Sequence, residues 1–438
     1  MILHKLNLAN FRAFEQIEIE FESDVTVIAG VNGVGKTAIL DAIAVLLSRA
    51  LPEFTEARNT ARSFVDDDIY IGKPSLELVG ALTVGEHRCH GIIQRVAAAE
   101  SPDLWHVLLQ QSGAIAVAEA DPLDDASREA RVVLQGLRSA PNQPIAVLFS
   151  PGRLLAGKPQ KLHTPNLEDK TRAYTGALDV RQVELRETME WFYAQQELET
   201  MRRTAGAEAQ RRIVAALRGV VEEFMPGVGN PRVVYDPKPR FLVDKNGVTL
   251  QLNQLSDGER GLLAIVFDLS RRLAIANPKL NDPIHEGKGI VLIDEIELHL
   301  HPRWQREALR RLRATFANCQ FIATTHSPQI LGEVEARCVR YLFRDEAGRV
   351  QRYTPDQALG LDSNRVLEDI MGTPARNEQV QSFLHELFRA IDREDFPKAR
   401  EKMREIGATL GDSDPELVRA RSLISFLGGE DEEHSQGR

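Results

Sequence analysis

Cysteine, positive charge and long apolar runs are all scarce in this chain of 438 residues. Its three cysteines, Cys89, Cys319 and Cys338, are widely spaced and odd in number, which gives neither a disulfide framework nor a zinc cluster. No stretch approaches the roughly 18 consecutive apolar residues of a membrane helix. Residues 1–6 lack the basic and apolar segments of a signal peptide. The sequence therefore predicts a cytoplasmic protein without membrane contact.

Positive charge is in short supply because 54 lysines and arginines stand against 64 aspartates and glutamates, a formal net charge of −10. This balance argues against a protein that binds nucleic acid non-specifically over much of its surface, since neutralising phosphates requires a surplus of Lys and Arg. It leaves room for a local basic groove. With 43% hydrophobic and 27% charged residues, the composition is that of a globular protein with one large domain or two ordinary ones.

Hydrophobic patterning along the chain predicts an α/β protein. Apolar runs rich in β-branched residues predict buried strands at residues 25–29, 144–149, 289–293 and 320–324. An alternating segment at 17–22 predicts a half-buried edge strand, and short alternating runs between 76 and 109 predict an antiparallel sheet. The charged segment 178–224 is helical in pattern without a sustained coiled-coil register. Asn246-Gly247 predicts a hairpin turn.

A phosphate-binding loop is the most specific motif in the sequence. Residues 30–37 match G-x-x-x-x-G-K-[ST] and stand between a buried strand and a helical segment, which is the context that confirms such a loop. The backbone is expected to wrap phosphates with its N–H groups inward at Asn32, Gly33, Val34 and Gly35. Lys36 is expected to reach the β- and γ-phosphates, and the Thr37 hydroxyl to bind Mg²⁺.

Two carboxylates, Asp294 and Glu295, end the apolar strand at 289–293. In a nucleotide site, the first is expected near Mg²⁺ and the second can polarise a water for in-line attack. His299 and His301 follow closely in the same loop, and two histidines with a glutamate would also suit zinc. Two interpretations therefore stay open for these histidines: zinc ligands, or side chains that line a dimer seam while Mg²⁺ accounts for the acids.

Two weaker elements depend on their position in the chain. Ser256, in Ser256-Asp257-Gly258-Glu259, precedes an apolar helix, so its hydroxyl and the following N–H groups can cap the helix and meet a γ-phosphate. His326 follows the strand at 320–324 and can donate a hydrogen bond to a γ-phosphate as a switch residue. Alone, the first is an ordinary N-cap and the second a structural histidine. Their order along the chain favours the functional interpretation.

These four elements, in the order phosphate loop, S-x-G-E, D-E and T-H-S-P, resemble the ABC ATPase family. Within it they are similar to the branch that contains RecF and the heads of the structural-maintenance-of-chromosomes (SMC) proteins. The segment Leu6–Phe14 is similar to the first strand and turn of that branch, where the residue matching Arg12 approaches the nucleotide. The resemblance covers residues 1–50 and 250–331 closely, and the middle of the chain loosely.

The resemblance implies ATP and Mg²⁺ as ligands, with Thr37 and Asp294 at the metal and with Glu295 and His326 as the catalytic residues of ATP hydrolysis. It also implies a head-to-tail homodimer or higher oligomer. In that arrangement one subunit presents its signature to the ATP held by Lys36 of the other, and the signature residues expected there are Ser256, Gly258 and Glu259. A glutamine that contacts Mg²⁺ is expected as well; the pattern around Gln94 does not assign it.

The fold implied by the resemblance is an α/β ABC-type ATPase head with split lobes, an antiparallel β subdomain and a short helical insertion. The expected parts are an N-terminal ATPase lobe at 1–155, the helical insertion at 156–230 and a C-terminal ATPase lobe at 231–362. A helical tail is expected at 363–438, and its polar, acidic end from residue 428 is predicted to be disordered.

Three features narrow the resemblance within the branch. Asp294–Pro302 is similar to the D-E-x-x-x-H-L-H-P pattern of stand-alone bacterial ATPases, including the overcoming-lysogenization (OLD) nucleases. The segment after His326 lacks the grouped acids of the Toprim domain in OLD nucleases, so no nuclease is expected within this chain. The segments 191–199 and 395–417 resemble the ATPases of Septu antiphage defence, the PtuA group. That group acts with a separate HNH nuclease, which implies nucleotide-gated control of such a partner.

Two alternatives to the defence role remain open at this stage. A RecF-like ATPase of DNA repair or recombination would carry the same nucleotide motifs, and a scaffold could keep ATP as a structural ligand without turnover. DNA contact is also open, because Arg303, Arg306 and Arg310 lie near one face of a predicted helix. Glu307 in the same helix fits the opposing interpretation, an ordinary solvated surface.

Overall fold

The computed structural model describes residues 1–58, 61–97, 103–110, 120–153, 159–180, 183–204 and 213–428. The chain divides into two compact units, Met1–Ser363 and Asn364–Arg438. All of the predicted nucleotide motifs lie in the first unit. The predicted boundary at 155–156 and residues 429–438 of the predicted disordered end fall outside the described residues, whereas residue 428 is the last residue of a helix.

The central sheet of the first unit has six strands in the order β14-β13-β3-β12-β11-β7. These are β3 (Val25–Gly30), β7 (Ile145–Phe149), β11 (Gly289–Ile293), β12 (Cys319–Thr325), β13 (Val339–Arg344) and β14 (Val350–Tyr353). Neighbouring strands are parallel except for β13 and β14. Every residue of β3, β7, β11 and β12 is buried, as a parallel sheet covered on both faces requires. The four strands predicted from apolar runs are confirmed.

A second, antiparallel sheet has the order β2-β1-β4-β5-β6. Its strands are β1 (Ile2–Phe11), β2 (Phe14–Glu20), β4 (Ser75–Val84), β5 (His87–Val96) and β6 (Leu104–Leu109). Every second residue of β4 is buried, which matches a sheet with one covered face. β2 is an edge strand with Ile17 and Ile19 buried. The predicted edge strand and antiparallel sheet are therefore confirmed.

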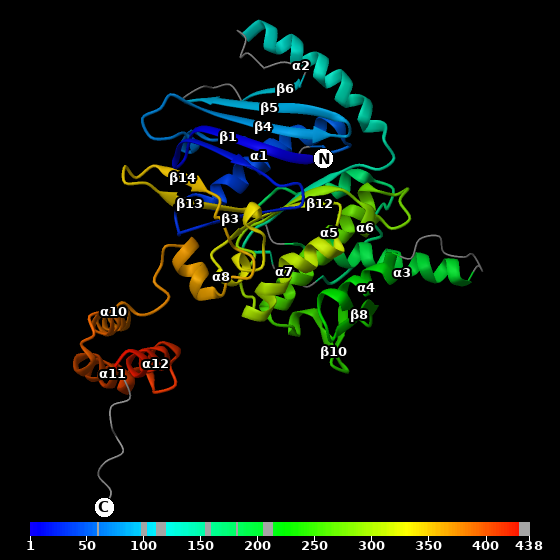
Figure 1. Cartoon of the computed structure of the whole chain (residues 1–438). Coiled ribbons are helices and arrows are strands. Elements are labelled where there is room, and N and C mark those ends of the chain that lie inside the picture. Colours follow the sequence, from blue (N-terminus) through cyan, green and yellow to red (C-terminus); the bar gives the residue numbers. More distant parts are fainter. Residues whose placement is uncertain are drawn as a thin grey trace, which may run out of the picture. The chain divides into compact units, whose positions relative to one another are not determined.

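Helices connect and cover the two sheets. The main ones are α1 (Lys36–Phe54), α2 (Ala120–Gln135), α5 (Asp257–Ala276), α6 (Pro283–Glu286), α7 (Pro302–Thr315) and α8 (Pro328–Leu331). Short 3-10 turns complete the connections: η1 (Asp66–Asp68), η2 (Gly136–Ser139), η3 (Lys170–Ala173), η4 (Leu252–Gln254) and η5 (Ala336–Cys338). Figure 1 shows α1 between the antiparallel sheet and the central strands. It contacts strands of both sheets, so its side chains are buried nearly all round.

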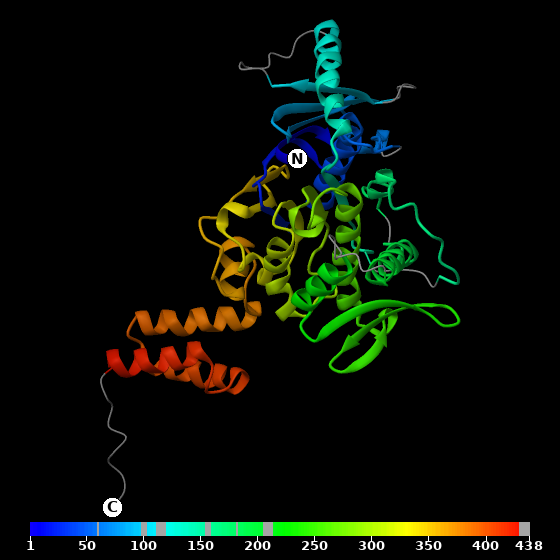
Figure 2. The same cartoon turned by 90° about the vertical axis from the view of Figure 1, so that its right-hand side faces the viewer.

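The helical segment predicted at 178–224 contains α3 (Leu185–Thr204) and α4 (Ile213–Phe224). They lead into a three-stranded antiparallel sheet of β8 (Val228–Tyr235), β9 (Pro239–Lys245) and β10 (Val248–Gln251), which is green in Figure 2. Asn246 and Gly247 both have positive φ, 49° and 82°, as a two-residue hairpin turn needs. The ring of Phe241 lies 5.6 Å from Phe192 of α3 and 4.9 Å from Phe267 of α5. These aromatic contacts fasten the segment to the signature helix. The α/β class with an antiparallel subdomain and a helical insertion is thus confirmed.

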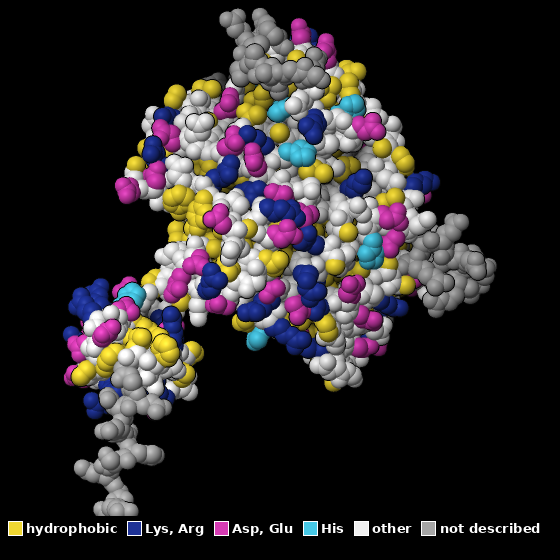
Figure 3. All heavy atoms as spheres, viewed as in Figure 1, with side chains coloured by type: hydrophobic (Ala, Val, Ile, Leu, Met, Phe, Trp, Pro, Cys, Tyr) yellow, Lys and Arg dark blue, Asp and Glu magenta, His cyan; other side chains and the backbone are white. Residues whose placement is uncertain are grey.

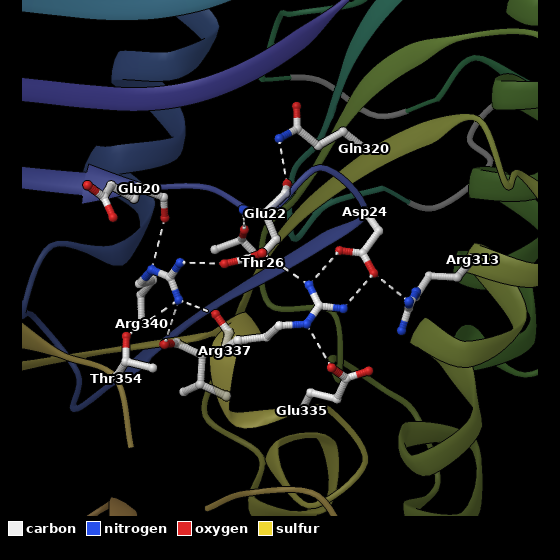
Figure 4. A network of polar contacts seen from close by, with 11 residues as sticks. Glu20, Glu22, Asp24, Thr26, Arg313, Gln320, Glu335, Arg337, Arg340 and Thr354 are labelled. Atoms are coloured by element: carbon white, nitrogen blue, oxygen red, sulfur yellow. Dashed lines mark hydrogen bonds and ion pairs between the residues drawn. The ribbon is translucent and has the colours of Figure 1, made fainter. Parts of the chain in front are cut away.

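An ionic network fastens the connection between β2 and β3, at the end of β3 that is remote from the phosphate loop (Figure 4). Asp24 pairs with Arg313 of α7 and with Arg337. Glu22 pairs with Arg337 at 3.0 Å and with the buried Arg340 at 3.1 Å. The network ties three distant segments together, and it engages Arg313 in holding the fold.

The second unit is helical, as predicted for the tail. Its helices are α9 (Ser363–Arg365), which begins at the boundary between the units, then η6 (Val366–Ile370), α10 (Glu378–Asp392), α11 (Phe396–Leu410) and α12 (Pro415–Gly428). Leu387, Ala399 and Leu417 are in its core, one from each long helix. Across the whole described part of the chain, no helix has the length and apolar character that crossing a membrane would take.

Candidate functional site

Three adjacent parallel strands bring the predicted motifs to one edge of the central sheet. The phosphate loop follows β3, His326 follows β12, and Asp294 and Glu295 follow β11. Because β12 lies between β3 and β11, the three segments end side by side although up to 290 residues separate them in the chain. The carboxyl ends of parallel strands are where open α/β sheets bind ligands.

The phosphate loop leads directly from β3 into α1. Gly33 and Gly35 have φ of 74° and 106°, a left-handed backbone that favours glycine. A Cβ on Gly35 would lie only 2.5 Å from the ring of Phe14. Asn32 and Gly33 are exposed and Val34 is buried. Gly35 occupies the N-cap without a capping side chain, so the first N–H groups of α1 are free to bind an anion.

Lys36 is buried beneath this loop. Its Nζ donates to the carbonyl oxygens of Gly30 at 2.9 Å and Val31 at 3.0 Å, and lies 3.3 Å from His326 Nδ1. Burial lowers the pKa of Lys36 to about 8, against the opposing effect of nearby carboxylates, of which Glu297 is the strongest. An ammonium group with so little water around it is well placed to exchange these carbonyls for phosphate oxygens.

Thr37 and Asp294 form the candidate metal-binding pair. The Thr37 hydroxyl lies 2.9 Å from Oδ2 of the buried Asp294, and Thr324 Oγ1 donates to Asp294 Oδ1 at 2.5 Å. A hydroxyl beside a carboxylate fits Mg²⁺, which prefers oxygen ligands and takes few of them from the protein when phosphates supply the rest. The sequence motifs for these two ligands therefore meet in space.

Glu295 stands at a strained turn directly after Asp294. Its φ is 47°, an uncommon backbone for a residue other than glycine. Its N–H donates to Thr324 Oγ1 at 2.8 Å, and its carbonyl accepts from Arg153 Nη2 at 2.9 Å. Both contacts involve the main chain. These main-chain contacts therefore fix the position from which the Glu295 carboxylate extends.

Arg153 is a residue of this site that the sequence analysis missed. It is buried and donates to three successive carbonyl oxygens, of Asp294 at 2.7 Å, Glu295 at 2.9 Å and Ile296 at 3.1 Å. Burial lowers the pKa of Arg153 to about 10, so the guanidinium stays charged at neutral pH. A lone arginine after the turn that ends β7 carries no recognisable motif, and only the fold places it under the acidic turn.

His326 is half-buried and faces Lys36 across 3.3 Å. Burial, and then the charge of Lys36, lowers the pKa of His326 below its usual value. A neutral imidazole carries one N–H, which can donate to a phosphate oxygen. The backbone N–H of His326 donates to Glu297 Oε1 at 2.5 Å. Glu297 is a second residue that the sequence analysis left out.

The two histidines after Glu295 have separate surroundings. His301 caps α7, where its Nδ1 accepts from the Arg303 N–H at 3.3 Å. His299 is exposed with a φ of 62°. Within the described residues, no group of three or more His, Cys, Asp or Glu side chains is arranged to hold a metal ion. The zinc interpretation of these histidines therefore has no ligand set to support it.

The signature residues form the start of α5. The Ser256 hydroxyl accepts from the Glu259 N–H at 3.4 Å and donates to Glu259 Oε2 at 2.8 Å, and Lys245 pairs with Glu259 Oε1 at 2.7 Å. The Ser256 backbone N–H also donates to Glu259 Oε2 at 3.1 Å, and this bond and the one from the Glu259 N–H together form a capping box. Ser256 is exposed, so within this chain it acts as a helix cap that faces outward.

Close packing explains why glycine occupies position 258. A Cβ at this position would lie 2.4 Å from the carbonyl oxygen of His299. The first turn of α5 therefore rests directly on the loop that follows β11, and any larger residue would push the two apart. The signature and the acidic loop are in contact inside one subunit.

Arg12 lies beside α1, at one wall of a cavity next to the phosphate loop. Its Nη1 donates to Asp41 of α1 at 2.9 Å, and its Nε donates to Asp68 at 2.8 Å. The cavity has a volume of about 960 Å³, and Arg344, which also lines it, reaches the Gly33 carbonyl at 3.4 Å. Ile71 lines the same cavity and is 93% exposed.

Gln94 and the arginines of α7 can also be placed. Gln94 lies on β5 and donates to Glu77 at 2.6 Å, so it stays unassigned as a magnesium contact. Arg311 donates to the Phe224 carbonyl at 2.7 Å and Arg313 pairs with Asp24. The candidates for DNA contact on this helix are the exposed Arg303, Arg306 and Arg310. Acidic and basic side chains are interspersed on the face that Figure 3 draws.

Comparison with protein families matches two parts of the chain. Residues 156–332 match a family described as "AAA domain, putative AbiEii toxin, Type IV TA system", and residues 5–94 match one described as "AAA domain". The second range holds the phosphate loop, and the first holds Ser256, Asp294, Glu295 and His326. Each matched range thus contains motifs of the candidate site.

Individual relatives agree with these matches. The "Retron Ec83 probable ATPase" of Escherichia coli is 37% identical over 48% of this chain and 38% of that protein. The "Septu protein PtuA" of Bacillus thuringiensis is 26% identical over 40% of this chain and 46% of that protein. The chain resembles the ABC-type ATPases of the RecF and SMC branch, PtuA among them. This ATPase-like chain spans less than half the length of these two curated relatives.

The similarity to retron ATPases was not anticipated from the motifs, whereas the similarity to PtuA was predicted and is confirmed. Among solved structures, an SMC head domain from Thermotoga maritima superposes with a TM-score of 0.44 at 14% identity, covering 81% of this chain and 100% of that one. The relation of this chain to PtuA and the retron ATPases therefore rests on sequence.

Proposed function

We propose that this chain is a cytoplasmic ABC-type ATPase that binds ATP with Mg²⁺ and hydrolyses ATP. The observation that carries the proposal is the meeting of Lys36, Thr37, Asp294 and His326 within hydrogen-bond distance at one sheet edge. Lys36 and the loop N–H groups would bind the β- and γ-phosphates, and Glu295 would orient and polarise the attacking water. Mg²⁺, held by Thr37 and Asp294, would neutralise charge that develops on the phosphates.

The cavity beside the phosphate loop supports a nucleotide rather than a free phosphate as ligand. Its rim offers the exposed apolar side chain of Ile71, on which a flat base can pack. Arg344, which also lines this space and reaches the Gly33 carbonyl, brings positive charge there, which favours an anionic ligand. Base, sugar and phosphates would thus follow one another from this cavity into the loop.

We further propose that ATP joins two copies of the chain head to tail. In this arrangement Ser256, Gly258 and Glu259 of one subunit face the ATP held by Lys36 of the other. The exposed position of Ser256 at a helix N-terminus supports this, because its hydroxyl and the N–H groups at the start of α5 suit a γ-phosphate. To meet the phosphate, the Ser256 hydroxyl would exchange its bond to Glu259 for one to the ligand, while Gly258 stays engaged in packing.

Substituting Ser256 with arginine is expected to leave a chain that binds ATP but stays monomeric. The added side chain fills the space where the second nucleotide would approach. Ser256→Ala is the matched control, because it loses the same helix cap, worth about 1 kcal/mol, without adding bulk. Light scattering with ATP in the hydrolysis-deficient Glu295→Gln background measures the mass. ATP-dependent dimers of Ser256→Arg would contradict the head-to-tail arrangement.

We propose that the partner of this ATPase is a separate HNH nuclease in antiphage defence. The similarity to the Septu protein PtuA supports this role. Co-expression of the chain with its neighbouring genes, followed by mass determination with and without ATP, tests it. A stable complex with a small HNH nuclease is expected. Stable binding to replication or repair proteins instead would overturn the proposal in favour of a RecF-like function.

A further inference from the structure

Glu297 joins two loops of the candidate site. It lies two residues after Glu295, in the loop of residues 295–301 that follows β11. Its Oε2 accepts from Thr325 Oγ1 at 2.9 Å, and its Oε1 accepts from the backbone N–H of His326 at 2.5 Å. The Glu297 carboxylate thus connects the acidic loop to Thr325, the last residue of β12, and to His326, which follows it.

Gln305 of α7 connects the same two loops at a second point. Its Nε2 donates to the Leu300 carbonyl at 2.9 Å, and its Oε1 accepts from Ser327 Oγ at 2.7 Å. The residues on both sides of His326 are therefore held by the acidic loop and by the helix that continues it. The acidic loop also contacts the start of α5, because Gly258 packs on the His299 carbonyl.

The contact of Glu297 with His326 has a clear physical purpose. His326 lies just beyond the last residue of β12, so its N–H finds no partner in the strand ladder, and a buried N–H without an acceptor is costly. A carboxylate acceptor gives a short, charge-assisted bond. With its backbone fixed in this way, His326 directs its ring at Lys36, on the side where the γ-phosphate is proposed to bind.

We propose that Glu297 is a positioning residue that fixes His326 for the reaction and couples it to the loop that carries Glu295. The proposal rests on the proposed ATPase function. His326 and Glu295, the two side chains expected to act at the γ-phosphate, then move as one unit. A shift of the acidic loop, including one that starts at the signature contact of Gly258 with His299, reaches His326 through Glu297 and Gln305.

Kinetics of two substitutions test the role in hydrolysis. Glu297→Ala removes both acceptors and is expected to lower kcat by about 100-fold, as a misplaced catalytic group does, with the Kd for ATP changed by less than about threefold. Glu297→Gln keeps the geometry, since its amide oxygen can accept from His326 and its NH₂ can donate to Thr325 Oγ1. It is expected to restore most of the rate. A Gln variant as inactive as the Ala variant would overturn positioning as the role.

Hydrogen exchange of the nucleotide-free protein tests the tether itself. In Glu297→Ala the His326 amide is expected to exchange at least about ten times faster, which corresponds to loss of one bond to a charged group. Glu307→Ala is the matched control, because that carboxylate pairs with Arg311 on α7. Unchanged exchange in Glu297→Ala would overturn the proposal. A wild-type chain without ATP hydrolysis would refute the proposed function, while the exchange result still decides whether the tether exists.

Discussion

Lys36→Ala is expected to abolish ATP binding, with Kd raised by at least about 100-fold. The side chain is buried beneath the phosphate loop, and its Nζ already contacts two loop carbonyls and His326. Its loss would remove a buried, localised positive charge at the β- and γ-phosphates in the proposed geometry. Bonds to charged groups contribute about 1.5–3 kcal/mol each, so two such bonds amount to at least a hundredfold in affinity.

Isothermal titration with ATP and Mg²⁺ measures this effect. Lys5→Ala is the matched control, because that ammonium pairs with Glu18 on the antiparallel sheet and takes no part in the site. The Lys36 variant is expected to fold at least as well as the wild type, since it no longer buries an ammonium at a cost. Undiminished ATP affinity in Lys36→Ala would refute the assignment of the phosphate loop.

Glu295→Gln is expected to reduce the rate of phosphate release by at least about 100-fold, the usual contribution of a general base, while ATP still binds. The amide keeps the size of the carboxylate but cannot polarise the attacking water. The turn itself is expected to survive, because Arg153 and Thr324 hold its main chain and not its side chain. The substitution therefore tests the role of the Glu295 carboxylate in hydrolysis without disturbing the turn that holds it.

Steady-state phosphate release and nucleotide affinity are measured together, with Glu307→Gln as a control for the same change of charge outside the site. If the proposed dimer forms around ATP, Glu295→Gln accumulates it and Lys36→Ala never forms it. Unaltered phosphate release in Glu295→Gln would remove Glu295 as the base. It would also favour the scaffold alternative if that release is negligible in the wild type.

Local sequence patterns predicted four of the six strands of the central sheet and the glycine-rich turn between β3 and α1, since these features depend on residues close in the chain. β3 and α1 flank a glycine-rich turn, and glycines with positive φ are needed wherever the backbone must curl in this way. His301 could also have been assigned from sequence, because a residue that accepts a hydrogen bond, directly before a proline, is a common helix start. The motif instead left two other interpretations open for His301, a zinc ligand and a side chain that lines a dimer seam.

The arginines of α7 illustrate what local patterns cannot decide. Five arginines occupy similar positions in the sequence, yet Arg313 pairs with Asp24 across 289 residues and Arg311 binds carbonyls at the end of α4. Arg303, Arg306 and Arg310 stay exposed. Only the packing of α7 against other segments distinguishes structural arginines from those available to a partner.

From the sequence alone came the predicted motifs of a nucleotide site: a phosphate loop, an acidic strand end, a helix-capping signature and a histidine, in an order that resembles the ABC ATPases. The tertiary structure decided how these groups are held. Arg153 and Glu297 belong to no motif, because their roles arise from carbonyls and amides 141 and 29 residues away. A side chain that supports another through space leaves no periodic or local signal in the sequence, and folding alone brings it to its place.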